Sequence, residues 1–216
     1  MDLTADRAKL KELYMPGTED FVLVDVPKLP FAMVDGQGSP EHGAGAAAIK
    51  CLFATIYPIR RAARSRLGKA FVEPPVEFLH LAADPRDLAT GKREEWRWRA
   101  MVTLPEWTDE AMFADAVAQA RRQPGGVPDT LRMELFEEGR CAQIMHVGRP
   151  DSISGRLDQL YREFLPRKRL TPAGAYHEIY LDDWSRVAPD RRRLVLRQPV
   201  RPRPERRMTP PYGKTR

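Results

Sequence analysis

The sequence is short of cysteine and has no long apolar run, and each shortage argues against a class of protein. Its two cysteines, Cys51 and Cys141, are too few for a disulfide framework and are not spaced like metal ligands. No stretch approaches the roughly 18 consecutive apolar residues of a membrane span. Residues 1–13 lack the apolar core of a signal peptide. We therefore expect a cytoplasmic protein with reduced thiols, no metal or other cofactor, and no membrane contact.

Excess positive charge is confined to one end of the chain. Residues 201–216 hold six basic residues and one acidic residue, so they carry five of the six net positive charges. Their proline- and arginine-rich composition cannot build a hydrophobic core, which predicts a disordered tail. This tail is the one part of the chain suited to nucleic acid or to an acidic surface. A solvated extension is the simpler interpretation.

The sequence does contain a repeated order of elements. Residues 18–105 and residues 130–200 each run strand, strand, helix, strand, strand, judged from apolar alternation and helical spacing. A helix over residues 108–123, with Thr108 as its N-cap, links the two halves. The other expected helices cover residues 5–14, 43–67 and 151–166. One strand each is expected in residues 21–26, 31–34, 74–84, 94–105, 177–183 and 191–200, and two strands are expected in residues 131–148, around a turn at Glu138 and Gly139.

This order predicts an α+β fold built from a duplicated strand-helix-strand-strand motif. We expect two curved antiparallel sheets with helices on one side, and residues 1–200 forming one domain. A pseudo-two-fold arrangement leaves a central cleft where the halves meet, which is a usual place for a ligand pocket.

A carboxylate interrupts an apolar strand near the end of the chain. In the stretch AYHEIYLDDW, residues 175–184, strand alternation puts Tyr176, Glu178 and Tyr180 on one face. A buried carboxylate is costly unless its pKa rises or a cation pairs with it, and aromatic rings beside it add cation–π attraction. The arrangement favours a planar organic cation as ligand. The alternative is an edge-strand glutamate that faces solvent or pairs with an arginine.

Several stretches together resemble the GyrI-like small-molecule-binding family, which includes stand-alone bacterial proteins and effector domains of multidrug-responsive transcription activators. In chain order they are KELY, PFAMVDGQGSP, PPVEFL, EWRWRAMVTLPEW, EGRCAQIMHVG, YHEIYL and LRQPV, from about Tyr14 to Val200. The resemblance implies a central pocket, flat aromatic and often cationic ligands, and a buried glutamate that faces them. It also implies a second activity, because some members are similar to hydrolases that open strained cyclopropane rings.

The chain departs from that family at two places. His80 and Leu81 stand where stand-alone members often have a tryptophan pair. Residues 149–153 replace a segment that usually carries proline, tyrosine, two acids and a glutamate. The missing tyrosine and glutamate argue against a simple transfer of catalytic activity.

These observations give two sets of candidate residues. If the protein is an enzyme, Glu178 and Glu77 are the catalytic candidates, with Glu178 as a general base that activates water. Glu77 is included through the pseudo-repeat, and a surface residue at a strand end is its alternative interpretation. The candidate ligand-binding residues are Glu178, Tyr176, Tyr180, Trp96, Trp98, Glu77 and His80.

Other motifs are weaker. His146 and His177 are expected in core or hydrogen-bonded roles, and HEIYL lacks the second histidine of the zinc-protease motif, so no metal site is expected. The leading hypothesis is a stand-alone protein that binds amphipathic aromatic or cationic compounds. The rivals are a hydrolase of electrophilic xenobiotics and an interaction protein that acts through its basic tail.

Overall fold

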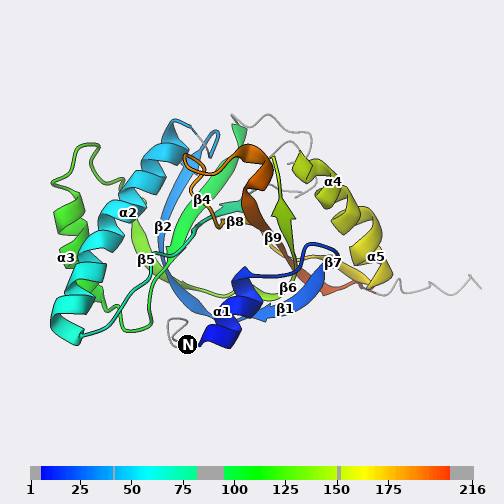
Figure 1. Cartoon of the computed structure of the whole chain (residues 1–216), viewed down its shortest axis with the longest axis horizontal. Coiled ribbons are helices and arrows are strands. Elements are labelled where there is room, and N and C mark those ends of the chain that lie inside the picture. The colour runs from blue at the N-terminus through cyan, green and yellow to red at the C-terminus, as the bar shows by residue number, and fades with distance from the viewer. Residues whose placement is uncertain (1–5, 41, 82–94, 150–151, 205–216) are drawn as a thin grey trace, which may run out of the picture.

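The chain folds around one continuous antiparallel sheet, shown in Figure 1. The computed structural model describes residues 6–40, 42–81, 95–149 and 152–204. Eight strands follow the order β1-β6-β9-β8-β3-β4-β2-β5, and β7 pairs with β9 outside this path. The strands are β1 (Val22–Val26), β2 (Leu29–Gln37), β3 (Val76–His80), β4 (Arg97–Thr103), β5 (Arg132–Phe136), β6 (Gly139–Val147), β7 (Leu170–Pro172), β8 (Tyr176–Tyr180) and β9 (Arg193–Pro202).

The two halves of the chain exchange their first strands. β1 pairs with β6 of the second half, and β5 pairs with β2 of the first half. The halves then meet where β3 and β8 pair antiparallel, with Phe78 opposite Glu178. The sequence predicts two sheets, and the structure joins them. The reason is that the β3–β8 ladder satisfies backbone N–H and C=O groups that would otherwise line two open edges.

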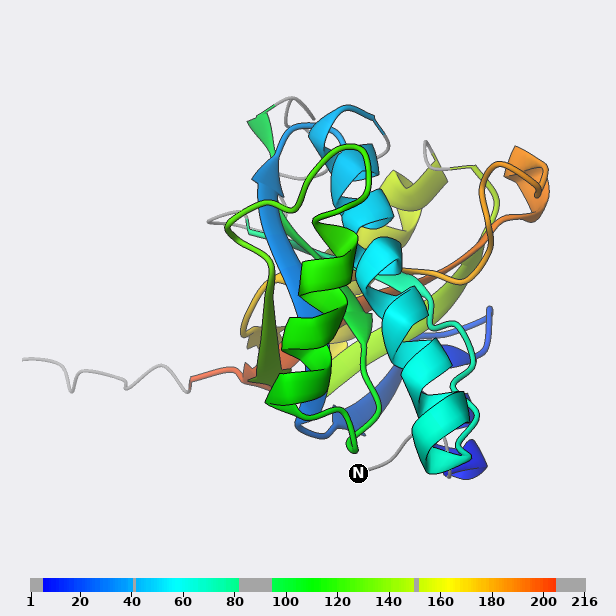
Figure 2. The same ribbon diagram turned by 90° about the vertical axis from the view of Figure 1, so that its left-hand side faces the viewer.

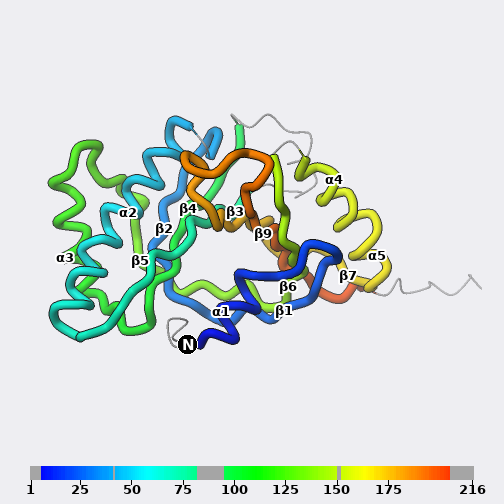
Figure 3. Tube along the Cα trace, viewed as in Figure 1, coloured from blue at the N-terminus to red at the C-terminus, as the bar shows by residue number. Residues whose placement is uncertain are grey.

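The helices lie at the two ends of the curved sheet. Figure 1 shows α2 and α3 over one end and α4 and α5 over the other, Figure 2 shows α2 and α3 side by side, and Figure 3 traces α1 next to β1. The α+β class predicted from the sequence is confirmed. The helical segments are α1 (Arg7–Tyr14), α2 (Ala44–Ala62), its π-helical extension η1 (Ala63–Leu67), α3 (Glu110–Ala120), α4 (Ile153–Asp158), the π-helical segment η5 (Gln159–Phe164), α5 (Leu165–Arg167) and the 3-10 turn η6 (Pro189–Arg191).

The register of the strands shows that α2 and α4–α5 cover the same face of the sheet. One row of consecutive cross-strand partners crosses that face: Val34, Ala100, Phe78, Glu178, Leu196 and Ile144. Val34, Ala100 and Phe78 belong to the core under α2 and α3, whereas Leu196 and Ile144 belong to the core under α4, η5 and α5. We call this surface the helix face. Glu178 lies in the row between the two helix-covered cores.

Each helix presents an apolar stripe to the sheet. Along α2, Leu52, Ile56 and Ile59 recur at helical spacing and are fully buried, and burying each such side chain stabilises the fold by roughly 1.5–3 kcal/mol. α1 covers the opposite face, where Leu13 and Tyr14 pack in a third core with strand residues of both halves. We call this surface the α1 face. The packing of α1 on this face covers β3 and β8 and holds them in position.

Two boundaries differ from the sequence predictions. The N-cap of α3 is Asp109 rather than Thr108, because the Asp109 carboxylate accepts the backbone N–H of Met112 at 2.7 Å. The helix predicted over residues 43–67 is present, and α2 continues through Pro58. β9 runs to Pro202 because β7 offers it a partner, with Thr171 opposite Arg201. Residues 201–202 therefore belong to the sheet, residues 203–204 are exposed without regular secondary structure, and the rest of the predicted tail, residues 205–216, lies outside the described residues.

No helix in the described part of the chain is long and apolar enough to cross a membrane.

Candidate functional site

β8 carries two different sites on its two faces. Strand alternation turns Tyr176, Glu178 and Tyr180 toward the helix face, as the sequence predicts, and turns His177 and Ile179 toward the α1 face. Strands β3 and β9 flank this position, and β4 lies on the other side of β3. Side chains from β3 and from residues just before β4 therefore reach the same place as those of β8.

The side chains of Tyr180 and His80 both contact Glu178 at the helix face. The residue is 7% exposed, so its carboxylate is largely shielded but not sealed from solvent. The Tyr180 hydroxyl donates a hydrogen bond to Oε2 of Glu178 at 2.7 Å. Nε2 of His80 lies 3.1 Å from the same oxygen, at ion-pair distance but without the alignment of a hydrogen bond. Both neighbours contact Oε2, so a ligand that reaches Glu178 meets a carboxylate already fixed in orientation.

Aromatic rings surround the histidine. The His80 ring stacks on Tyr176 with centroids 5.7 Å apart and an interplanar angle of 24°. Trp96 meets it edge-on at 5.2 Å. Tyr176 is 1% exposed, and burial together with the nearby charge of Glu178 raises the pKa of its hydroxyl well above the ordinary value. Tyr176 is therefore neutral across the physiological range.

A second aromatic group continues from Tyr180 toward the surface. Trp184 lies 4.7 Å from Tyr180, ring centroid to ring centroid, and Arg192 stacks over Trp184 at 4.9 Å. Tyr180 packs against both helix-face cores, and it is half-buried. Sequence reasoning missed Trp184, although LDDW directly follows the strand that carries Glu178. The turn geometry that folds it back onto Tyr180 has no sequence signature.

Trp98 has a supporting role. It is 1% exposed, and its indole N–H donates to the carbonyl of Gly38 at 2.9 Å. Phe78 contacts it edge-on at 5.4 Å. The opposite residue on β2 is Gly36, where any Cβ would overlap the indole. Trp98 thus anchors the wall behind Phe78 and Tyr180 and offers no open face to a ligand.

The structure separates Glu77 from Glu178. Glu77 lies opposite Ile179, on the α1 face, and its side chain is fully buried. The Tyr14 hydroxyl donates to its Oε1 at 3.0 Å, and Nε2 of His177 lies 3.0 Å from its Oε2. Six of the seven candidate ligand-binding residues are thus on the helix face, and Glu77 is not. Glu77 therefore lies on the opposite face of the sheet from the other six candidates.

Glu77 belongs instead to a buried charge network on the α1 face. Nδ1 of His177 lies 3.0 Å from Oε1 of Glu138, and Arg197 donates to Oε2 of Glu138 at 2.9 Å. Arg197 also donates to the carbonyl of Leu13 at 2.6 Å, which ties α1 to β9. The formal charges of the two carboxylates are balanced by those of His177 and Arg197. A balanced, hydrogen-bonded set is the arrangement in which buried charge is tolerated.

Opposite charges within this network shift the pKa values of His177 and Glu138. Burial alone lowers the pKa of His177, but the carboxylates of Glu138 and Glu77 outweigh it and raise the value to about 9. Burial alone raises the pKa of Glu138, but His177 and Arg197 outweigh it and lower the value to about 2. Glu138, His177 and Arg197 are therefore charged near neutral pH. It acts as an internal support for β3, β8 and β9 rather than as an open site.

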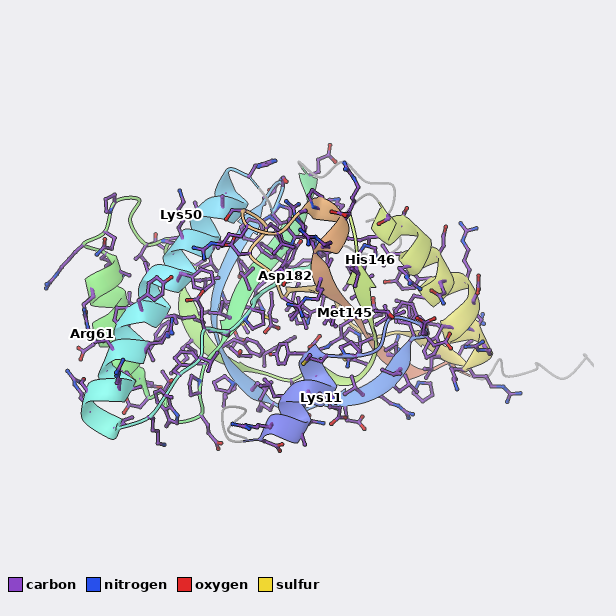
Figure 4. All side chains as sticks on the ribbon, in the orientation of Figure 1. Lys11, Lys50, Arg61, Met145, His146 and Asp182 are labelled. Atoms are coloured by element: carbon purple, nitrogen blue, oxygen red, sulfur yellow. The ribbon has the colours of Figure 1, made fainter. Side chains whose placement is uncertain are left out.

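His146 also lies on the helix face. It stands opposite Leu194, which is opposite Tyr180, and Figure 4 shows it on the side of α4, whereas Met145 lies toward α1. Its Nε2 lies 3.2 Å from both the Arg149 carbonyl and the Ser152 hydroxyl. Burial lowers its pKa. The hydrogen-bonded role expected from the sequence is what the structure shows.

The described residues contain no group of three metal-ligating side chains that could hold an ion. An open groove of about 720 Å³ runs between α2 and α3, lined by Phe53 and Tyr57 and by two cations, Lys50 and Arg61, both labelled in Figure 4. A cationic ligand is not suited to that groove, because its charged lining residues are both positive. The negative charge needed for such a ligand lies at Glu178.

Comparison with known proteins agrees with this fold. A model of the GyrI-like small molecule binding domain matches residues 19–200. An uncharacterised conserved protein from Listeria innocua is 30% identical, with a TM-score of 0.78, over 89% of this chain and 97% of that one. A hydrolase from Listeria innocua is 28% identical, with a TM-score of 0.76 over the same shares. The C-terminal domain of EcmrR, 9% identical with a TM-score of 0.54 over 85% and 98% of the chains, shares the fold alone. No curated protein matches the sequence.

Proposed function

The chain belongs to the GyrI-like small-molecule-binding family, and on that premise we propose that it is a stand-alone binding protein for flat, amphipathic aromatic cations. The ligand lies on the helix face between the two helix-covered cores, with Glu178 as its counter-charge. The single observation that carries this proposal is the carboxylate of Glu178, 7% exposed, set among Tyr176, Tyr180 and Trp96.

The charge and the rings favour the same ligand. A cation over a tyrosine or tryptophan face gains roughly 0.5–2 kcal/mol per good contact. A carboxylate in a largely shielded place attracts a cation more strongly than one in open solvent, because the local dielectric constant is lower. A planar cation satisfies both groups at once, whereas an anion meets repulsion from Glu178. Tyr180 and Trp96 are only partly buried, so they supply surface that a ligand can cover.

A dye-binding experiment tests the proposal. A rhodamine-type cation titrated with the protein should show saturable fluorescence polarisation. Glu178→Gln keeps the size of the side chain and an acceptor for Tyr180, but removes the charge. Loss of one partner of a shielded charge pair costs about 2–5 kcal/mol, so the dissociation constant should rise at least tenfold, since 1.4 kcal/mol is a factor of ten.

The control is Asp183→Asn, which removes the same charge from an exposed carboxylate that follows the same strand and whose hydrogen-bond partner, Ser185, is local. This variant should bind the dye like the wild type. If Glu178→Gln also binds like the wild type, Glu178 is not the counter-charge.

A second candidate function is hydrolysis of electrophilic aromatic compounds. Two solved relatives from Listeria innocua, 28% and 27% identical over 89% of this chain, are described as hydrolases. A shielded carboxylate oriented by Tyr180 and His80 also suits a general base that activates water, which contributes about 10²–10⁴ in rate. Glu77 takes no part in this reaction, because it lies on the other face of the sheet.

Mass analysis separates the two functions. Incubation with a cyclopropane-bearing alkylating aromatic should yield a product heavier by one water if the protein is a hydrolase, and Glu178→Gln should abolish it. Saturable binding of the same compound without any product supports binding alone. We place either activity in the bacterial cytoplasm, where the two buried, unpaired thiols of Cys51 and Cys141 stay reduced.

A further inference from the structure

Neither ring nitrogen of His80 makes a hydrogen bond to a described residue. Its side chain is fully buried, and Nε2 faces Glu178 at 3.1 Å. Nδ1 makes no hydrogen bond to any described residue. Buried polar atoms without a partner are rare, because each one loses the hydrogen bonds that water would give it. An unpartnered nitrogen beside the candidate counter-charge is therefore a place where a donor group of a ligand can bind.

Glu178 decides which kind of partner that is. A carboxylate 3.1 Å from Nε2 favours the tautomer that carries its proton on Nε2, because the positive end of that N–H bond then lies nearer the negative charge. Nδ1 is then a bare lone pair that accepts a hydrogen bond. Tyr176 and Trp96 hold the ring plane by stacked and edge-on contacts, so the direction of this lone pair is fixed.

We propose that Glu178 and His80 form a carboxylate–imidazole dyad that selects ligands with an N–H donor on the aromatic cation. Glu178 supplies the counter-charge and sets the histidine tautomer, and Nδ1 of His80 accepts the hydrogen bond of the ligand. Primary and secondary aminoaryl and amidinium cations satisfy both groups. Fully N-alkylated cations satisfy the charge alone and leave Nδ1 buried and unpaired. This inference rests on the proposed binding function and names the ligand class of the same site.

Two dyes that share one ring system and differ in whether their amino groups carry hydrogen or methyl provide the test. A rhodamine methyl ester with unsubstituted amino groups and its tetramethylated counterpart share the ring system, the ester and the positive charge. A hydrogen bond to a neutral acceptor contributes about a two- to tenfold difference in affinity. The wild type should therefore bind the unsubstituted dye about two- to tenfold more tightly. His80→Phe keeps an aromatic ring of similar size and should lose this two- to tenfold advantage of the unsubstituted dye.

The matched control is His146→Phe, the same substitution at a buried histidine of the same face whose contacts are to Arg149 and Ser152. It should keep the wild-type preference. Glu178→Gln should weaken binding of both dyes. If the wild type binds neither dye, the proposed function fails. If it binds both equally, or if His80→Phe keeps the preference, the dyad is refuted while cation binding stands.

A measurement on the unmodified protein covers the case in which His80→Phe does not fold. The chain has only four histidines, so the ring ¹⁵N signals of histidine-labelled protein are readily assigned by comparison of variants. We expect His80 to carry its proton on Nε2 and the unsubstituted dye to shift its Nδ1 signal, with a smaller shift for the tetramethylated dye. A proton on Nδ1, or an unchanged Nδ1 signal with dye bound, contradicts the proposal.

Discussion

The buried network on the α1 face makes stability depend on pH in a range where most proteins are insensitive. The pKa of His177 rises from 6.5 to about 9 because Glu138 and Glu77 contact both of its ring nitrogens. A group whose pKa is raised by folding stabilises the folded state fully below its unfolded pKa. That contribution disappears as pH rises through the folded pKa. The free energy of unfolding should therefore fall between about pH 6.5 and 9.

The magnitude follows from the size of the shift. One pKa unit corresponds to about 1.36 kcal/mol, so a rise of about 2.5 units gives about 3 kcal/mol of stability that is lost between pH 6 and pH 9.5. Glu138, with its pKa lowered to about 2, contributes in the opposite direction and only as pH falls below about 4.5. It does not overlap with this window. The buried thiol of Cys141, whose pKa burial raises, adds a further loss at the alkaline end.

A charge-neutral double variant isolates the contribution of His177. Glu77→Gln combined with His177→Gln removes one negative and one positive charge and leaves the 2.9 Å contact between Glu138 and Arg197 in place. Urea unfolding of both proteins should be measured in half-unit steps from pH 6 to 9.5. Groups common to both proteins, such as Cys141, cancel in the difference. The wild-type curve should fall about 3 kcal/mol further than the variant curve, and parallel curves would falsify the assignment of a charged, buried His177.

Two further predictions concern packing and the end of the chain. Gly36→Ala should lower the free energy of unfolding, measured in urea, by about 1–3 kcal/mol, because the new Cβ overlaps the packed indole of Trp98. The control is Gly17→Ala, where the new Cβ meets open space and should change the free energy of unfolding little. Removal of residues 205–216 should leave dye binding and urea unfolding unchanged. If the tail binds nucleic acid, the same truncation should abolish a salt-sensitive shift of labelled RNA. A tail that is only a solvated extension gives no such shift in either protein.

Local patterning predicted the position of Glu178 well. Apolar alternation in residues 175–184 is enough to place Tyr176, Glu178 and Tyr180 on one face, because the side-chain period of a strand is two. The same reasoning fails for Glu77. Both glutamates occupy similar places in the two halves, but the antiparallel register sets Phe78, not Glu77, opposite Glu178. A register offset of one residue moves a side chain to the other face of a sheet.

The partners of these residues were beyond the reach of the sequence. His80 contacts Glu178 only because β3 pairs with β8, and the two residues are nearly a hundred positions apart. The network on the α1 face joins Tyr14, Glu138 and Arg197 across most of the chain. Such contacts depend on which strands become neighbours. Residue types and spacing within each strand do not carry that information.

The crossed placement of β1 and β5 has a consequence for how ligands of different sizes are accommodated. Each half contributes a strand to the edge of the other, and β3 and β8 join the middle. The two halves therefore have no hinge about which they can move apart, because such a movement would break the backbone hydrogen bonds between their strands. If the protein binds ligands of different sizes, as the proposed function implies, we expect the partly buried rings of Trp96 and Tyr180 to rotate while the sheet keeps its shape. For the same reason, neither half should survive as a separately expressed fragment.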